Sequence, residues 1–234
     1  MICLGCSGNA GRRRRARRPC QTYTDVYFVV VTLSARAVVD VGVELAAREG
    51  LDTVGMRAVA KALGVTPMAM YRHVGDAAAL RAVVVDQLLA GLDEVPAEGT
   101  WDQRCTTWAH SARRAFGQAP GLAHHVLLEW IHLPRVLMAL DSLVATLERD
   151  GPPGCDPVAG ANAILMHVLM RAQAEEIVRA DGLRRDLSTL RSHRSRLPHL
   201  WAHRDEYRRA RLDEHFAYGL AALLAGLISA RRAS

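Results

Sequence analysis

Apolar residues repeat with the period of a helix from residue 34 onward. The first such stripe follows the spacing i, i+3, i+4, i+7 and i+8, which is the spacing of one helical face. Its members are Val38, Val41, Gly42, Leu45 and Ala46. Ser34 stands where an N-cap residue belongs, because its hydroxyl can accept a hydrogen bond from the first helical turn. The pattern predicts a helix from a Ser34 cap to about Arg48, with this stripe buried.

A second pattern, over residues 53–74, predicts two short helices joined by a tight turn. Residues 57–63 are helix-forming, and Gly64 ends this helix, as glycine commonly does at a C-terminal cap. Thr66 is a suitable N-cap, and Pro67 fits the first position of the second helix. This is the arrangement of a helix-turn-helix, whose second helix lies in the DNA major groove.

Helical patterns continue toward the C-terminus. Asp76 caps a fourth helix that runs to about Leu92, and Pro96–Gly99 follows as a linker. Further helices are expected over residues 101–118, 121–128, 133–149, 156–180 and 212–231. Residues 181–205 are expected to form a loop with one short helix near 198–203.

No long segment alternates as a strand does, so the fold class is predicted to be all-α. The N-terminal part is expected to be a three-helix helix-turn-helix DNA-binding domain, and the C-terminal part a helical ligand-binding and dimerisation domain. The predicted organisation is a disordered basic arm over 1–32, the DNA-binding domain over 33–95, and the sensor and dimerisation domain over 100–234.

Positive charge gathers in two places. The chain has a formal net charge of +6, and six of its arginines lie within residues 12–18. Without these six, basic and acidic residues both number 24, so the rest of the chain is formally neutral. Across residues 53–75 the charged side chains are three cations, Arg57, Lys61 and Arg72. This places local positive charge where a phosphate backbone would lie.

The arginine-rich arm has no helical period and is open to two interpretations. It either strengthens DNA attachment as a disordered arm or reflects an upstream start codon wrongly assigned. The arginines and the following Phe28–Val31 faintly resemble a signal peptide, but this apolar run is too short for one. Since no apolar run approaches the roughly 20 residues of a membrane span, we expect no membrane contact and a cytoplasmic, nucleoid-associated protein.

The sequence offers weak candidates for a metal site and none for catalysis. Cys3 and Cys6 form a Cys-x2-Cys pair to which Cys20 could add a third ligand, but no second pair follows. A second possible cluster consists of His124, Glu129 and His132. The sequence contains no nucleophile elbow, phosphate loop or paired metal-ligand motif. We expect no metal, no cofactor and no enzymatic activity, and the unpaired cysteines fit a reducing compartment.

Several segments of the chain carry a family resemblance. They are the two-helix motif over 53–74, the Glu49–Asp52 exit of the first helix, and Tyr71–Val74 leading into the fourth helix. They resemble the tetracycline-repressor (TetR) family of bacterial transcriptional regulators. Phe216–Leu227 is similar to the last helix of the tetracycline-repressor-like sensor domain, so the resemblance covers about residues 34–231.

The resemblance and the residue types together indicate a DNA-binding set. Its members are Arg57, Thr66, Pro67, Met68, Ala69, Tyr71, Arg72 and His73. Thr66 can reach a phosphate, the residues after it can contact thymine methyl groups, and Arg72 can reach a guanine edge or a phosphate. The resemblance implies that Arg57 contacts DNA and that Tyr71 and His73 contact its backbone. The alternative is that Tyr71 and His73 pack against the first helix.

Large apolar side chains with a histidine among them mark a candidate ligand pocket in the sensor part. The candidates are Trp108, Trp130, Met138, Met166, His167 and Met170. The alternative is that they are ordinary core residues, since Met and aromatic residues at helical spacing commonly are. The pocket interpretation predicts a small, mostly apolar effector of unknown identity.

The last helix is predicted to hold a homodimer together, with the long helix over 156–180. Its apolar stripe contains two glycines, and glycine lets helices approach closely. The predicted interface residues are Phe216, Gly219, Leu220, Leu223 and Leu227.

The sequence thus predicts a ligand-responsive transcriptional repressor. It would bind a palindromic operator as a homodimer, and the effector would release it by displacing the fourth helix. One alternative is a ligand-independent or activating DNA-binding regulator. Another is a helical module with a decayed DNA-binding motif, which is weakly favoured by Gly55 and Ala77. At these positions the family often has a Ser or Thr cap and a phosphate-binding Lys.

Overall fold

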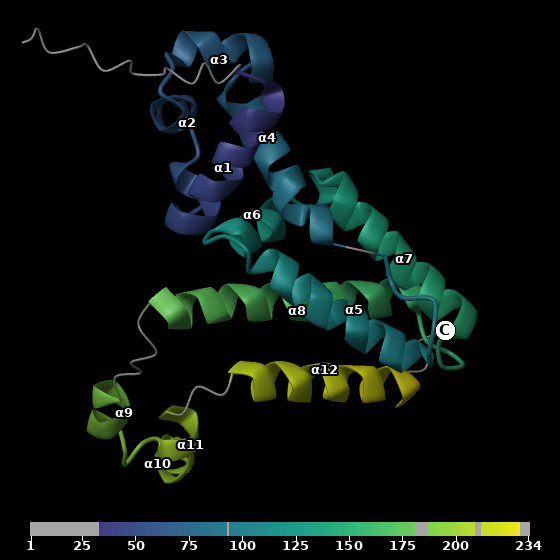
Figure 1. Cartoon of the computed structure of the whole chain (residues 1–234). Coiled ribbons are helices and arrows are strands. Elements are labelled where there is room, and N and C mark those ends of the chain that lie inside the picture. The colour runs from purple at the N-terminus through teal and green to yellow at the C-terminus, as the bar shows by residue number, and fades with distance from the viewer. Residues whose placement is uncertain (1–32, 93, 181–186, 209–211, 230–234) are drawn as a thin grey trace, which may run out of the picture. The chain divides into compact units, whose positions relative to one another are not determined.

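The secondary structure of the described residues is entirely helical. The computed structural model describes residues 33–92, 94–180, 187–208 and 212–229, so the predicted basic arm over 1–32 lies outside the described residues. Within these ranges the chain forms twelve α-helices and three short 3₁₀ helices, and no strand (Figure 1). The all-α fold class predicted from the hydrophobic pattern is confirmed.

The first four helices begin where the sequence predicts. They are α1 (Ala35–Glu49), α2 (Met56–Leu63), α3 (Pro67–Val74) and α4 (Ala77–Leu88), with the 3₁₀ helices η1 (Leu51–Thr53) and η2 (Leu89–Gly91) following α1 and α4. The Ser34 hydroxyl accepts a hydrogen bond from the Ala37 amide at 3.1 Å. The Asp76 carboxylate accepts one from the Ala79 amide at 2.8 Å. Both predicted N-caps are therefore confirmed.

Helices α1 and α4 pack most closely at Gly42. A Cβ atom built on this glycine would lie 2.6 Å from Cγ2 of Val84, well inside normal contact distance. Val38 and Leu45 on α1 and Leu80 on α4 are buried beside it. A larger residue at position 42 would require the Val84 side chain or the helices themselves to shift, because protein interiors are closely packed.

Five longer helices build the part of the chain after residue 100, predicted above as the sensor part. They are α5 (Trp101–Phe116), α6 (Leu122–Glu129), α7 (Pro134–Asp150), α8 (Pro157–Ala180) and α12 (Leu212–Ser229), with the 3₁₀ helix η3 (Trp130–His132) between α6 and α7. Each corresponds to a predicted helix. At the start of α8, the Asp156 carboxylate accepts hydrogen bonds from the amides of Val158 and Ala159 at 3.0 and 3.1 Å.

The segment before α12 contains more helix than expected. In place of one short helix it has three: α9 (Ser188–Ser192), α10 (Pro198–Ala202) and α11 (Arg204–Arg208). Helices α9 and α10 contain no buried residue. Hydrophobic periodicity did not indicate α9 and α11 because helices this short need no continuous apolar face.

Helix α8 is the centre of the sensor part. It packs against α5, α6, α7 and α12, and Figure 1 shows α12 running alongside it. The hydrophobic core is continuous from Val38 on α1 to Leu224 on α12. The helix-turn-helix and the sensor helices therefore share one core, and the division between 33–95 and 100–234 stays a prediction.

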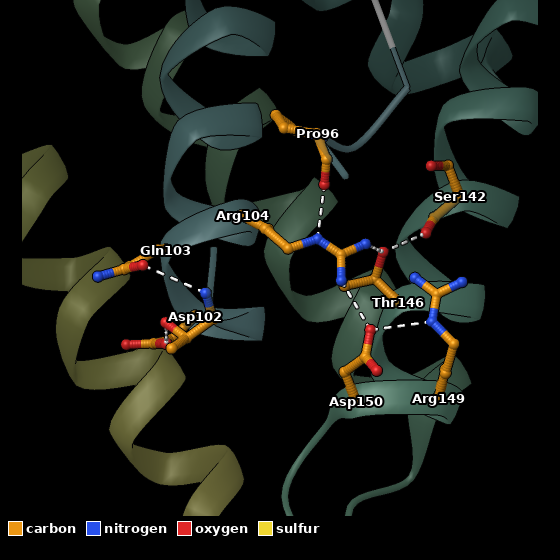
Figure 2. Close-up of polar contacts among 9 residues, drawn as sticks. Pro96, Asp102, Gln103, Arg104, Ser142, Thr146, Arg149 and Asp150 are labelled. Atoms are coloured by element: carbon orange, nitrogen blue, oxygen red, sulfur yellow. Dashed lines mark hydrogen bonds and ion pairs between the residues drawn. The ribbon is translucent and has the colours of Figure 1, made fainter. Parts of the chain in front are cut away.

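One buried arginine holds the linker between η2 and α5. Arg104 on α5 is 5% exposed, and its Nε donates a hydrogen bond to the carbonyl of Pro96 (Figure 2). Its Nη1 donates to the Asp150 carboxylate at 2.7 Å, and its Nη2 donates to the Thr146 hydroxyl at 3.2 Å. The linker is thus fixed to α5 and to the end of α7.

Candidate functional site

The turn between α2 and α3 is tight and hydrogen-bonded. Gly64 adopts a left-handed conformation with φ 69°, which glycine takes without strain. The Val65 amide donates to the carbonyl of Ala60 at 3.0 Å, and the Thr66 hydroxyl accepts from the Ala69 amide at 3.3 Å. These bonds satisfy backbone groups that are left free where one helix ends and the next begins. They fix the direction of α3 relative to α2.

Helix α3 is anchored by Met70 and exposes most of its other side chains. Met70 is fully buried, whereas Met68 and Tyr71 are 76% and 50% exposed. The predicted DNA-binding residues that lie exposed are Arg57, Thr66, Pro67, Met68, Tyr71, Arg72 and His73, and Ala69 is half-buried. Tyr71 and His73 are exposed, so both side chains are accessible to DNA, and their contact with DNA stays a prediction.

Positive charge on this face is not neutralised locally. Arg57, Lys61 and Arg72 form no ion pair with any of the described residues. Gly55 caps α2 without a side-chain hydrogen bond, and the space beside its Cα is open. The face of α2 and α3, which we call the basic face, therefore offers cationic and hydroxyl groups that suit phosphate oxygens.

The six predicted pocket residues differ in their surroundings. They divide into residues in or against the core, namely Trp108, Trp130 and Met166, and residues more than half exposed, namely Met138 and Met170. The ring of His167 is engaged by its own chain, with Nε2 3.2 Å from the carbonyl oxygen of Phe216. The ligand-binding role of these six residues therefore stays a prediction.

A cavity lined by charged residues opens where α5, α8 and α12 meet. We call it the polar cavity, and its volume of about 540 Å³ is within the range of small-molecule sites. It is lined by His110, Arg113, Arg114, Gly117, Ala172, Glu175, Arg179 and Asp213. None of these residues is among the six predicted ones. Met138 lines a different cavity, beside α7.

Arg113 makes hydrogen bonds to both carboxylates of the polar cavity. Its Nε donates to Glu175 Oε2 at 3.1 Å, and its Nη2 donates to Asp213 Oδ1 at 2.7 Å. Nη2 also lies 2.8 Å from Glu175 Oε1, as an ion pair without hydrogen-bond alignment. Its guanidinium lies 4.6 Å from the centre of the Phe216 ring. Burial acts to lower the pKa of Arg113, but hydrogen bonds and charges from Glu175 and Asp213 raise that pKa overall. Arg113 therefore stays charged.

A second cavity, of about 380 Å³, extends from α8 to α1. It shares three lining residues with the polar cavity, namely Gly117, Ala172 and Arg179, and it reaches Ala47 on α1. Two hydrogen bonds connect the same elements. The Gly121 amide donates to Glu176 on α8 at 2.7 Å, and the Leu51 amide donates to the carbonyl of Pro120 at 2.8 Å. The α5–α6 turn thus joins α8 to the end of α1.

The apolar stripe predicted as a dimer interface packs inside its own chain. None of the predicted residues Phe216, Gly219, Leu220, Leu223 and Leu227 is exposed. Phe216 and Leu220 are 0% and 1% exposed, and a Cβ atom on Gly219 would lie 2.5 Å from Cε1 of His167. The burial of Phe216 and Leu220 inside their own chain corrects their assignment to the interface. Gly219, Leu223 and Leu227 are half-buried, and their part in a dimer stays a prediction. Outward-facing α12 residues include Tyr218 and Ala222.

Potential metal ligands do not cluster within the described ranges. In those ranges no three His, Cys, Asp or Glu side chains, including His124, Glu129 and His132, lie together as metal ligands. Cys3, Cys6 and Cys20 lie outside the described residues. No single described helix is long and apolar enough to cross a membrane, although the bent pair Leu122–His132 and Pro134–Asp150 meets that criterion by length and composition alone.

An exposed, basic helix-turn-helix joined to a helical bundle defines the class of helix-turn-helix transcriptional regulators. The comparisons narrow this class to one family. The family profile described as "Bacterial regulatory proteins, tetR family" matches residues 38–81, and the profile "Tetracyclin repressor-like, C-terminal domain" matches residues 95–231. The chain therefore belongs to the TetR family, as the resemblance predicted. A comparison with curated proteins finds no match.

Solved structures of this family share the fold. A possible TetR family transcriptional regulator from Streptomyces coelicolor A3(2) is 25% identical with a TM-score of 0.73, covering 85% of this chain and 100% of that one. ActR from Streptomyces coelicolor, in complex with actinorhodin, is 22% identical with a TM-score of 0.67, covering 87% and 99%. Mycobacterium smegmatis BioQ, with its double-stranded DNA operator, is 22% identical with a TM-score of 0.59, covering 85% and 99%.

Proposed function

We propose that the chain is a ligand-responsive transcriptional repressor that binds a palindromic DNA operator as a homodimer. The observation that carries this proposal is the basic face, on which three cations form no ion pair with the described residues and Tyr71 is half exposed. BioQ, which has the same fold, was solved with its operator. A repressor of this kind acts in the bacterial cytoplasm, at the nucleoid.

The roles on the basic face follow from position and chemistry. Helix α3 enters the major groove with Pro67 and Met68 at its leading end, where apolar atoms can contact thymine methyl groups. Arg57 on α2 and the hydroxyl of Tyr71 contact phosphates and so fix the register of α3. Arg72 reaches a base edge or a phosphate. Met70 keeps α3 in this position because its buried side chain ties the helix to the core.

Homodimerisation is proposed to use the outer faces of α8 and α12. Large apolar side chains remain exposed there, with Met170 54%, Ile177 56%, Tyr218 79% and Ile228 64% exposed. Exposed apolar patches of this kind are typical of protein interfaces. A two-fold dimer presents two copies of α3 to the two half-sites of a palindrome.

Release from the operator is proposed to follow effector binding in the sensor part. We infer a small, mostly apolar effector that displaces α4 and so changes the spacing of the two α3 helices. The contacts that support this coupling run from Glu176 on α8 to Gly121, and from Pro120 to Leu51 in η1, directly after α1. Helix α1 is packed closely on α4 at Gly42. The effector must bind the released state more tightly than the DNA-bound state. ActR was solved with actinorhodin.

A selection experiment tests the proposal. The full chain is incubated with a random double-stranded DNA library, and bound sequences are enriched over several rounds. The expected result is an inverted repeat whose half-sites lie about one helical turn apart, roughly 10 base pairs. Sedimentation of the complex should show two protein chains per site. The matched control is a variant with Arg57 and Tyr71 both changed to Ala, which should enrich no sequence. Failure of the wild-type chain to enrich any sequence would refute the proposal.

A further inference from the structure

We propose that the polar cavity binds a small organic carboxylate, and that the side chain of Asp213 occupies the carboxylate's position when the cavity is empty. The proposal deepens the effector site of the proposed function, on which its regulatory consequence rests, and it adds an anionic group to a mostly apolar effector.

Charge in the polar cavity favours an anion. Three arginines line it against two carboxylates. Arg113 is shared between Glu175 and Asp213, and Arg179 donates to Glu175 at 3.3 Å. Arg114 is exposed and forms no ion pair with any described residue. One guanidinium group therefore remains for an incoming carboxylate, and Arg–carboxylate pairs are among the stronger hydrogen-bonded contacts.

Glu175 fixes the position of Arg113. It is only 2% exposed, and a buried carboxylate needs a charged partner, because an unpaired buried charge is strongly destabilising. Arg113 supplies that partner through Nε and Nη2. The Phe216 ring packs against the face of the guanidinium, with the Arg113 Cζ 4.6 Å from the ring centre. Arg113 is thus held on two sides and presents a fixed donor, Nη2, to a third group.

Asp213 is the third group, and it is easily replaced. Its Oδ1 accepts from Arg113 Nη2 at 2.7 Å, yet its side chain is 92% exposed. Exposed ion pairs contribute little to stability, so removal of Asp213 from Arg113 is not costly. Arg114 lines the same cavity, so a ligand carboxylate that replaces Asp213 would pair with Arg113 and bring its charge toward Arg114 as well. This geometry makes Asp213 a built-in competitor for the ligand.

Replacement of Asp213 has a structural consequence. Asp213 lies in the first turn of α12 and is the residue that ties this turn to Arg113 on α5. An anion in the cavity would release the turn from α5. The cavity shares Arg179 with the second cavity, which reaches Ala47 on α1. Occupancy is therefore placed to affect both the dimerisation helix and the helix-turn-helix.

The test compares naphthoate with its neutral amide, naphthamide, on the full chain by isothermal titration calorimetry. Naphthoate should bind the wild-type chain, and naphthamide should bind at least about tenfold more weakly, because it cannot form the charged pair. Asp213→Asn should bind naphthoate about fivefold more tightly, since its competitor for Arg113 is weakened. Arg114→Gln should bind about tenfold more weakly. Asp141→Asn, which changes an exposed aspartate in the cavity beside α7, is the matched control and should not differ from wild type.

Several results would overturn the proposal. They are equal affinity for naphthoate and naphthamide, unchanged naphthoate affinity in Asp213→Asn, and lack of naphthoate binding by both wild type and Asp213→Asn. Circular dichroism of each variant verifies its fold, and the side chains of Arg114, Asp141 and Asp213 are all exposed. The DNA selection is a separate readout. If naphthoate binding follows the expected order and no operator is enriched, the proposed function fails and the anion site stands.

Discussion

The Arg104 guanidinium lies 2.7 Å from the Asp150 carboxylate, so a residue near the start of α5 is bonded to the last residue of α7. The same guanidinium donates to the carbonyl of Pro96 in the linker (Figure 2). Three segments that are separate in the sequence therefore depend on one side chain. This side chain is 5% exposed, so its bonds are shielded from water.

We predict that Arg104→Ala lowers the free energy of unfolding by roughly 2–4 kcal/mol, because it leaves the Pro96 carbonyl and the Thr146 hydroxyl without their donor. Urea denaturation measures the change. Arg149→Ala is the matched control, since Arg149 also donates to Asp150, at 3.0 Å, but is 65% exposed. Its effect should stay below about 1 kcal/mol. Equal effects of the two substitutions would contradict the prediction.

The stability that Asp150 contributes should depend on pH. Hydrogen bonds from Arg149 and then Arg104 lower the pKa of Asp150 below its ordinary value of 3.8. A lowered pKa means that the contribution is present above pH 3.8 and is lost as the pH falls through the lower, folded-state pKa. The stability of wild type relative to Asp150→Asn should therefore decrease as the pH falls below the folded-state pKa of Asp150. Thermal unfolding over a pH series measures it, and a constant difference would argue against the bond.

Two substitutions on the basic face should weaken operator binding without loss of the fold. Tyr71→Ala and Arg57→Ala should each reduce affinity for the selected operator by roughly 1–3 kcal/mol, because each removes a contact with DNA. Both residues are exposed, so the helices should keep their stability. Fluorescence titration at fixed salt gives the affinity. Arg149→Ala, on α7, is the matched loss of an exposed cation and should bind like wild type.

The two faces of α12 should respond differently to a charge. Ala222→Arg places a cation on the exposed face and should give folded monomers, because the charge would be left unpaired in the dimer contact. Leu220→Arg places it in the core and should unfold the chain, since Leu220 is 1% exposed. Sedimentation and circular dichroism separate the outcomes. A folded dimer of Ala222→Arg would locate the interface elsewhere.

Deletion of residues 1–20 tests the basic arm, which lies outside the described residues. If the arm binds phosphates, its removal should weaken binding to operator and to random DNA alike. It should also reduce the salt dependence, by about 0.9 in the logarithmic slope for each phosphate that the arm neutralises. Unchanged slope and affinities would favour the interpretation of a wrongly assigned start codon.

Local signals in the sequence predicted most of the helices. Ser34, Asp76 and Asp156 mark helix starts through side-chain caps that need only nearby residues. Gly64 marks the turn for the same local reason. The family resemblance predicted that this motif binds DNA. Which of its side chains are exposed to solvent could be seen only in the structure. It shows Met70, and not Tyr71, as the residue that anchors α3.

The polar cavity was not predictable from the sequence because its lining residues come from distant positions. Arg113 is 62 residues from Glu175 and 100 residues from Asp213. Periodicity predicted correctly that the stripe on the last helix is buried. It does not say which surface buries it, and the structure shows that His167 on α8 of the same chain packs against Gly219.

The shared core sets a limit on how this regulator can evolve. Helix η2 packs against α5, and the Leu51 amide is bonded to Pro120 in the sensor part. A recombination event that joined these DNA-binding helices to a foreign sensor would expose their apolar residues and break that bond. For the effector-responsive function proposed above, we therefore expect substitutions around the existing cavities to change specificity at a lower cost in stability than an exchange of whole domains.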